Sequence, residues 1–279
     1  MYAIATLANN KALDDLKVFL FSLQLYNENN LPTLYIYCDT SINTFLETQT
    51  LYKGAIHKKV VLDTYNGFTR SQMEKLPGEN YENRWVDLMC EKMNLLEWAH
   101  TLEKSVLFCD ADICFLGALP EIDDSVQVGL SRHYIRSSDE AKFGTYNGGF
   151  VFSSSNTMIE LWKSATKSSR YYEQAALEEL CSTYKIYEFP IQNNYGWWRL
   201  LQGNESIEIL KGQWSIKRNN TSSGICVQGL PLLSIHTHWK INDSATNYFN
   251  DFVLTFLEKL KSVDKTKRFI NFIKKTRKN

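Results

Sequence analysis

The sequence has no long hydrophobic run, only five prolines and no clustered cysteines. None of its apolar stretches reaches the roughly 20 residues that cross a bilayer. The opening stretch, MYAIATLANN, has neither the basic region nor the long apolar region of a signal peptide. The six cysteines show no CxxC and no disulfide-framework spacing. These absences argue against a membrane-spanning or disulfide-stapled protein, and we expect a cytoplasmic location.

Charge of either sign is not in excess, because 31 Lys and Arg balance 31 Asp and Glu among 279 residues. This balance does not favour a nucleic-acid partner. The basic residues are nevertheless concentrated at the end of the chain, where eight of them stand against one acid from Lys261 onward, interleaved with Phe269, Ile270, Phe272 and Ile273. We interpret 262–279 as a basic amphipathic tail that is either a frayed, solvated end or a peripheral contact with anionic lipid.

Hydrophobic residues make up 44% of the chain and recur in an alternating strand and helix pattern. Four early segments read as strands: YAIATL, TLYIYCD, KKVVLD and SVLFCD. Apolar residues at helical spacing follow the first and the second of these segments. A polar loop over 65–82 precedes a long helix over 84–100. Later segments predict strands at SVQVGLS and GGFVFS with a polar loop between them, helices over 157–168, 171–184 and 245–261, and a late strand at LLSIHTH.

This alternation is typical of a mostly parallel sheet with helices on both faces, which places the chain in the α/β class. We found no repeat and no linker. The sequence therefore predicts one domain over 1–261, with a nucleotide-binding half (1–115) and an acceptor-shaping half (116–261).

Two carboxylates interrupt the apolar segment SVLFCDADICF. Asp110 and Asp112 are two residues apart, so an extended chain presents both on one side. The carboxyl end of a buried parallel strand is where open α/β sheets bind their ligands. Adjacent carboxylates repel each other unless a cation lies between them, and oxygen ligands favour Mg²⁺ or Mn²⁺. We interpret the pair as a divalent-metal site for a diphosphate; the alternative is a pair of solvated turn acids.

Four sequence blocks, in order, resemble the GT-A glycosyltransferases of the glycogenin and galactosyltransferase group (family 8). They are EKMNLLEWAHTLEKSVLFCDAD, YNGGFVFSSSNTMIELW, YYEQAALEEL and LLSIHTHWK. The resemblance covers about 84–240 and implies a GT-A, Rossmann-like fold with its D-x-D at a strand end. It also implies a metal-dependent transferase that moves a sugar from a UDP- or GDP-sugar to a glycan, lipid-linked or protein acceptor, with retention of configuration. Neutral imidazole among the ligands suits Mn²⁺ better than Mg²⁺.

The resemblance also implies roles for individual residues. Asp110, Ala111 and Asp112 match the D-x-D, and either His236 or His238 would be the third metal ligand. Lys92 matches the helix lysine that reaches the donor, and Lys240 follows the histidines without the family's glycine-containing spacer. Asn147 and the pair Glu173 and Gln174 match positions beside the donor sugar and its anomeric carbon. The end of the first strand would lie under the nucleoside, which makes candidates of Thr6, Leu7, Ala8 and Asn9.

Each of these residues also has an ordinary structural interpretation. A histidine on a strand is usually structural, Asn147 precedes two glycines as a turn residue does, and Lys92, Glu173 and Gln174 are common on solvated helix faces. NNYGWWRLLQGN adds Tyr195, Trp197 and Trp198, which form either a stacking platform for an acceptor sugar or part of the core.

Three rival classes were weighed against the transferase. A D-x-D-x-T phosphatase would carry its acids on the first strand and a Thr where Cys114 stands, and a nucleotidyltransferase would have a Gly-rich, basic loop in place of LANNKALDD. A non-catalytic sugar-nucleotide or carbohydrate-binding protein of the same fold remains the alternative, because a fold can keep its site and lose turnover.

Overall fold

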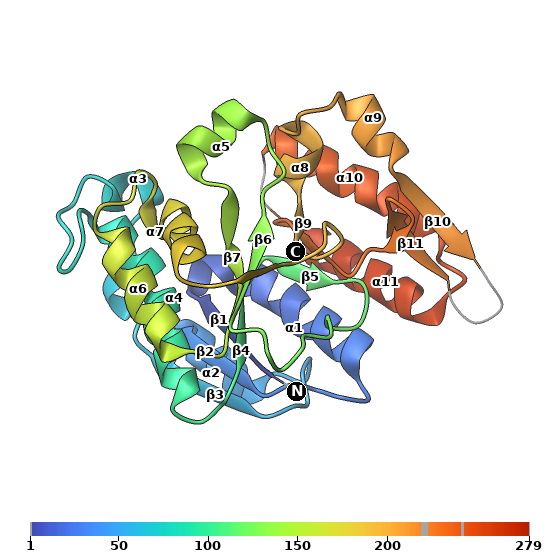
Figure 1. Cartoon of the computed structure of the whole chain (residues 1–279). Coiled ribbons are helices and arrows are strands. Elements are labelled where there is room, and N and C mark those ends of the chain that lie inside the picture. The colour runs from blue at the N-terminus through green and yellow to red at the C-terminus, as the bar shows by residue number, and fades with distance from the viewer. Residues whose placement is uncertain (1, 219–222, 241–242, 279) are drawn as a thin grey trace.

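The computed structural model describes residues 2–218, 223–240 and 243–278 (Figure 1). Its centre is a seven-stranded sheet of order β3-β2-β1-β4-β7-β6-β8. The strands are β1 Ala3–Ala8, β2 Leu34–Cys38, β3 Ile56–Val60, β4 Val106–Cys109, β6 Val128–Arg132, β7 Tyr146–Ser153 and β8 Ile186–Glu188. β3, β2, β1 and β4 run parallel to one another, and β7 runs antiparallel to both β4 and β6. The α/β prediction is confirmed.

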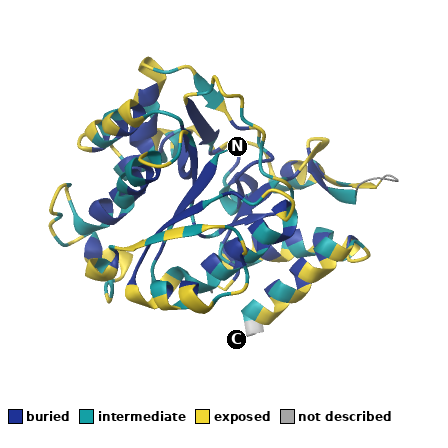
Figure 2. Cartoon of the chain, turned by 90° about the horizontal axis from the view of Figure 1, so that it is seen from below, coloured by how far each residue is buried: buried dark blue, intermediate teal, exposed yellow. Residues whose placement is uncertain are grey.

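Helices cover both faces of this sheet (Figure 1). Ala3 and Ala5 of β1 belong to the cluster that includes residues of α4 (Arg84–His100) and α6 (Asn156–Thr166). Ile4 belongs to the cluster that includes residues of α1 (Leu13–Asn27) and α2 (Thr40–Thr48). This division follows from the alternation of side chains along a strand. Figure 2 shows the central strands of the sheet, coloured as buried, between the helical layers.

Two smaller sheets and a helical layer complete the second half. One sheet joins β5, β13 and β9, and the other joins β10, β11 and β12. Their strands are β5 Ile113–Phe115, β9 Tyr195–Gly196, β10 Trp214–Arg218, β11 Ser223–Val227, β12 Leu230–Pro231 and β13 Ser234–His236. The helices of this layer are α8 Trp197–Leu201, α9 Ile207–Gly212, α10 Ser244–Lys259 and α11 Asp264–Lys278.

The predicted elements differ from the structure in several places. The third strand was expected at 58–63 and occupies Ile56–Val60, because Leu62 leaves the sheet to pack with Met73 and Leu88. The helix predicted over 171–184 is a short α7 (Tyr172–Ala175) followed by a 3₁₀ helix, η3 (Ala176–Ser182). Short helices also lie within predicted loops or after a strand. They are η1 Asn10–Ala12, η2 Asp63–Tyr65, α3 Arg70–Met73 and α5 Ser137–Phe143.

The basic tail forms α11, and its apolar side lies in the protein core. Phe269, Ile270 and Ile273 are buried in one cluster with residues of α10 and α1, and the ring of Phe272 stacks on Phe21 at 4.1 Å between centroids. The core of the domain therefore continues through this helix, past residue 261. None of the helices described is long and apolar enough to cross a membrane.

Candidate functional site

The two carboxylates and a histidine come together where the large sheet meets the sheet of β5, β13 and β9. Asp110 follows β4, and its N–H donates to the carbonyl of Gly149 on β7 at 2.9 Å. The antiparallel register of β5 and β13 places Ile113 opposite His236, and the Thr237 N–H donates to the Asp112 carbonyl at 3.0 Å. Backbone pairing thus fixes all three side chains relative to one another.

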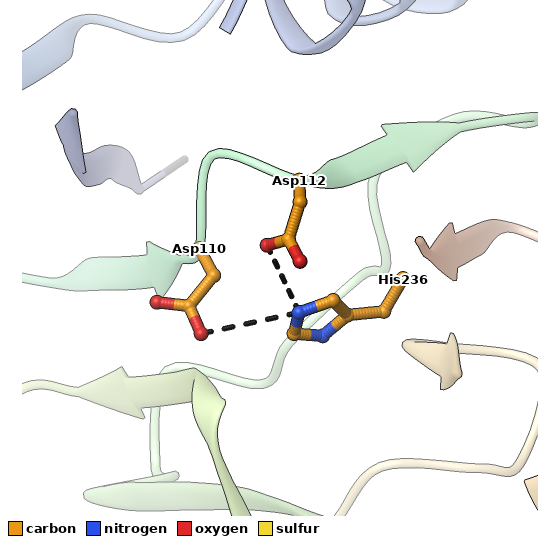
Figure 3. A group of neighbouring side chains, drawn as sticks. All are labelled: Asp110, Asp112 and His236. Carbon is orange, nitrogen blue, oxygen red and sulfur yellow. Dashed lines mark ion pairs between the residues drawn. The ribbon is translucent and has the colours of Figure 1, made fainter. Parts of the chain in front are cut away.

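Asp110, Asp112 and His236 each direct a potential ligand atom toward the other two (Figure 3). His236 Nε2 lies 2.9 Å from Asp112 Oδ1 and 4.0 Å from Asp110 Oδ2, and the ligand atoms of the three residues lie within 4.8 Å of one another. Two ligands at right angles about an ion, each at about 2.1 Å, are roughly 3 Å apart. The donor set and its spacing therefore fit Mg²⁺ or Mn²⁺.

His238 is engaged differently, although the sequence placed it beside His236 as an equal candidate. Its Nδ1 lies 2.7 Å from Asp15 Oδ2 and its Nε2 lies 3.3 Å from Asp112 Oδ2. Burial alone would lower the pKa of His238, but Asp112 and Asp15 raise it to about 9. Burial would likewise raise the pKa of Asp112, yet His236 and His238 hold it well below its usual range.

We call Asp110, Asp112 and His236 the metal-ligand cluster, because these three residues are the candidate ligands. Lys92 lies beside this cluster as a buried ammonium. Its Nζ is 3.2 Å from Asp110 Oδ1, 2.9 Å from Glu173 Oε1 and 3.3 Å from the Gly148 carbonyl. Burial opposes its charge, but the two carboxylates raise the pKa of Lys92 above its ordinary value. Lys92 and Glu173 are both only 4% exposed, so neither lies on a solvated helix face.

Asn147 and Gln174 lie on the other side of Gly148. The Asn147 Oδ1 accepts from the Gly149 N–H at 3.0 Å, and Gln174 Nε2 donates to the Phe143 carbonyl at 2.9 Å. A weak contact of 3.5 Å joins the two side chains. Both amides are therefore held by the protein next to the buried pair of Lys92 and Glu173.

A cavity of about 750 Å³ opens beside the two aspartates. Nine of the residues singled out in the sequence line it: Leu7, Ala8, Asn9, Lys92, Asp110, Ala111, Asp112, His238 and Lys240. Thr6 is fully buried, and its hydroxyl has no hydrogen-bond partner among the described residues. His236, Asn147, Glu173 and Gln174 do not line this cavity.

Several other residues of the cavity were not predicted from the sequence. Asp14 and Asp15 stand in the first turn of α1, directly after β1, and Asp14 Oδ2 pairs with Lys240 Nζ at 2.9 Å. The loop and helices after β3 supply apolar and cationic walls. These residues are Leu62, Phe68, Arg70, Met73, Trp85, Leu88 and Met89. Their place at the start of the first helix, shortly after the first strand, is the signal that could have indicated the two acids of α1.

The aromatic residues of NNYGWWRLLQGN divide between core and site. Tyr195 is fully buried and packs against Phe249 and Trp214. The Trp198 ring meets the ring of His236 edge-on at 4.9 Å, whereas Trp197 is half-buried. Trp198 therefore lies beside the candidate site, whereas Trp197 packs against Trp198 and against the core cluster of this half.

No family model matches the sequence, and no curated protein resembles it closely enough in sequence to be recognised as a relative. Similar solved structures do exist. The structure of galactosyltransferase LgtC in complex with donor and acceptor sugar analogs is similar at a TM-score of 0.54 and 12% identity, covering 98% of this chain and 95% of that chain. The chain has the GT-A fold. Its D-x-D lies at the carboxyl end of β4, as that fold predicts.

Two further structures are similar to smaller parts of the chain. Mouse xyloside xylosyltransferase 1 in its apo form matches at a TM-score of 0.48 and 12% identity, over 71% of this chain and 89% of that chain. The glycosyltransferase GlyE of Streptococcus pneumoniae TIGR4 matches at 0.42 and 14% identity, over 70% of this chain and 47% of that chain.

The buried ion pair yields a stability prediction. Lys92→Met leaves the Glu173 carboxylate buried without a counter-charge, so we expect a loss of about 3–5 kcal/mol in the free energy of unfolding. Adding Glu173→Gln should recover part of it. Lys163→Met, which breaks the more exposed pair with Glu97, should cost at most about 1 kcal/mol. Denaturant titration measures all three; equal costs for Lys92→Met and Lys163→Met would contradict the buried pair.

Proposed function

We propose that the protein is a metal-dependent glycosyltransferase. It would move a sugar from a UDP- or GDP-sugar to a carbohydrate, glycolipid or glycoprotein acceptor. One observation carries the proposal: Asp110 and Asp112, which converge with His236, line the 750 Å³ cavity that reaches the end of β1. A cavity of this size falls within the range of small-molecule and cofactor sites.

A divalent cation, which we propose to be Mn²⁺ or Mg²⁺, would be held by Asp110, Asp112 and His236. Gly149 supports this assignment, because a Cβ there would lie 2.3 Å from Asp110 Oδ2 and 2.7 Å from His236 Cε1. The missing side chain is what lets the carboxylate and the imidazole converge. When bound, such an ion stabilises the negative charge that develops on a departing diphosphate.

The chain's own cations would orient the diphosphate in the cavity. Lys240, Lys11 and His238 all line it on the side of α1. Positive groups in fixed positions stabilise a leaving phosphate without reorganisation during the reaction. We assign Asn9 and the backbone at Thr6–Ala8 to the nucleoside, because the end of β1 forms the cavity wall there.

The sugar would be bound toward Gly148, beyond the aspartates. Lys92 holds Glu173 there, and Gln174 accepts from the Gly148 N–H at a long 3.4 Å. We propose that Gln174 and the ion-paired Glu173 stabilise the positive charge that develops on the sugar, with net retention of configuration. Trp197 and Trp198 would offer the acceptor an aromatic face.

Contact with a membrane remains a further proposal. Because the apolar side of α11 is buried, exposed basic residues such as Lys267, Arg268 and Lys275 are what this helix offers to anionic headgroups. The contact would then be electrostatic rather than an insertion of apolar side chains.

A donor screen tests the proposed activity. We expect one nucleotide sugar, offered with Mn²⁺, to raise the melting temperature and to be hydrolysed slowly in the absence of acceptor. A ligand at 100 times its Kd adds about 2.7 kcal/mol to the stability of the native state, which a thermal scan resolves. The same panel with EDTA is the control. Stabilisation without hydrolysis or transfer would favour the non-catalytic alternative, and no response to any donor would contradict both.

A further inference from the structure

Asn194, which the sequence did not single out, lies fully buried between the metal-ligand cluster and Asn147. Its φ of 55° is in the left-handed region, which asparagine adopts at lower cost than most residues. The backbone N–H of Asn194 donates to Ser234 Oγ at 2.9 Å. Arg199 holds the preceding turn by donating to the carbonyls of Ile191 and Asn193. The backbone therefore fixes where this side chain points.

Hydrogen bonds determine which way the two amides face. A backbone N–H can only donate, so the Asn147 atom 3.0 Å from the Gly149 N–H must be the oxygen. That oxygen also accepts from Asn194 Nδ2 at 3.0 Å. The opposite atom of the Asn194 amide, Oδ1, therefore faces His236 Nδ1 at 2.8 Å. An oxygen in this position requires a proton on Nδ1.

We propose that Asn194 is a positioning residue that keeps the proton of His236 on Nδ1, so that Nε2 is the nitrogen available to a divalent cation held with Asp110 and Asp112. Metal-binding histidines usually donate their other N–H to such a partner, which fixes both the tautomer and the ring orientation. The inference rests on the proposed function only in that it takes the cluster to bind a cation.

Hydrogen bonds connect His133, Asn147, Asn194 and His236 in series, and we call this series the relay. It shows how Asn147 contributes to the position of His236. Its Nδ2 lies 3.2 Å from His133 Nε2, and His133 Nδ1 donates to the Gly144 carbonyl at 2.9 Å. Burial lowers the pKa of His133 to about 4, so the ring is neutral and its Nε2 accepts. With both ends of its amide engaged in this way, Asn147 acts on the site through Asn194 and His236. The sequence had suggested instead that it contacts the sugar.

Three variants test the relay by their Mn²⁺ affinity, measured by electron paramagnetic resonance without any donor. Asn194→Gly removes the side chain but tolerates the positive φ, and should weaken Mn²⁺ binding about 10- to 100-fold. Asn194→Asp keeps an acceptor for His236 Nδ1 and should stay within a few-fold of the wild type. Asn193→Ala removes the buried neighbouring amide, which does not touch His236, and should change nothing.

Histidine ¹⁵N NMR gives a readout that loss of packing alone would not produce. With five histidines in the chain, the His236 signal can be assigned by substitution. We expect a proton on Nδ1 both before and after Mg²⁺ is added, and its loss or exchange with Nε2 in Asn194→Gly. If Asn194→Gly does not fold, Asn147→Ala replaces it as the test. This variant removes the oxygen that orients the Asn194 amide, so His236 should again lose its Nδ1 proton or exchange it with Nε2.

Two results would overturn the relay: a proton on Nε2 of His236 in the Mg²⁺-loaded wild type, or unchanged Mn²⁺ affinity in Asn194→Gly. A wild type that binds no Mn²⁺ would instead contradict the proposed metal-dependent function. In that case the metal-free spectrum still tests the hydrogen bond to Asn194, because a His236 without a proton on Nδ1 would overturn it.

Discussion

Asp112→Asn is expected to abolish Mn²⁺-dependent donor hydrolysis and to weaken Mn²⁺ binding by at least about 100-fold. A direct ligand contributes more to metal affinity than a group that only hydrogen-bonds to a ligand, and losing such a group already lowers the affinity about 10- to 100-fold. The fold should survive the change, because asparagine keeps the shape of the side chain. Since His236 and His238 both pair with Asp112, we expect a modest loss of about 1–3 kcal/mol in the free energy of unfolding.

The controls for this variant come from the same cavity. Asp14→Asn removes a carboxylate that pairs with Lys240 outside the metal-ligand cluster, and His238→Ala removes a partner of Asp112 without removing a member of that cluster. Both should keep Mn²⁺ affinity within a few-fold by electron paramagnetic resonance. If EDTA leaves the turnover of the wild type unchanged, the aspartates are structural turn residues and the metal assignment is wrong.

Local sequence pattern was sufficient for most of the large sheet. The helix predicted over 84–100 is α4 with the same ends, because Asn83 caps its start and apolar residues recur along its buried side. The strands predicted at YAIATL and TLYIYCD consist mostly of apolar residues without polar alternation, as expected of strands buried on both faces. The periodicity of a strand or a helix is visible within about ten residues, so these elements need no knowledge of their neighbours.

The failures have a different physical origin. At Tyr172 the chain adopts a φ of 47°, and Trp162 Nε1 donates to the Glu173 carbonyl, so tertiary contacts override a helical pattern over 171–184. The two histidines could not be separated from spacing alone, since i and i+2 on a strand face the same side. What distinguishes them is Asn194 beside His236 and Asp15 beside His238, and both partners are distant in sequence.

Gly149 is another residue whose role could not be predicted from the local sequence. In the sequence, YNGGFVF reads as a strand with two glycines that weaken it. In the structure, Gly149 lies on β7 opposite the end of β4, where its missing side chain makes room for Asp110 and His236. Glycine at such a position indicates close approach of other groups to the backbone, but only the fold reveals which groups approach.

Gly149→Ala is therefore expected to remove metal binding although it changes no ligand. The new Cβ would lie 2.3 Å from Asp110 Oδ2, a distance at which the carboxylate must move, and 2.7 Å from His236 Cε1. Displacing two ligands of one ion should weaken Mn²⁺ binding by at least about 100-fold and reduce donor hydrolysis accordingly.

Gly224→Ala on β11 is the matched control, because a Cβ there meets no atom within 4 Å among the described residues. Electron paramagnetic resonance and thermal melting of both variants separate a lost site from a lost fold. Wild-type Mn²⁺ affinity in a folded Gly149→Ala protein would show that Asp110 and His236 do not converge at this strand, and the cation site would have to lie elsewhere.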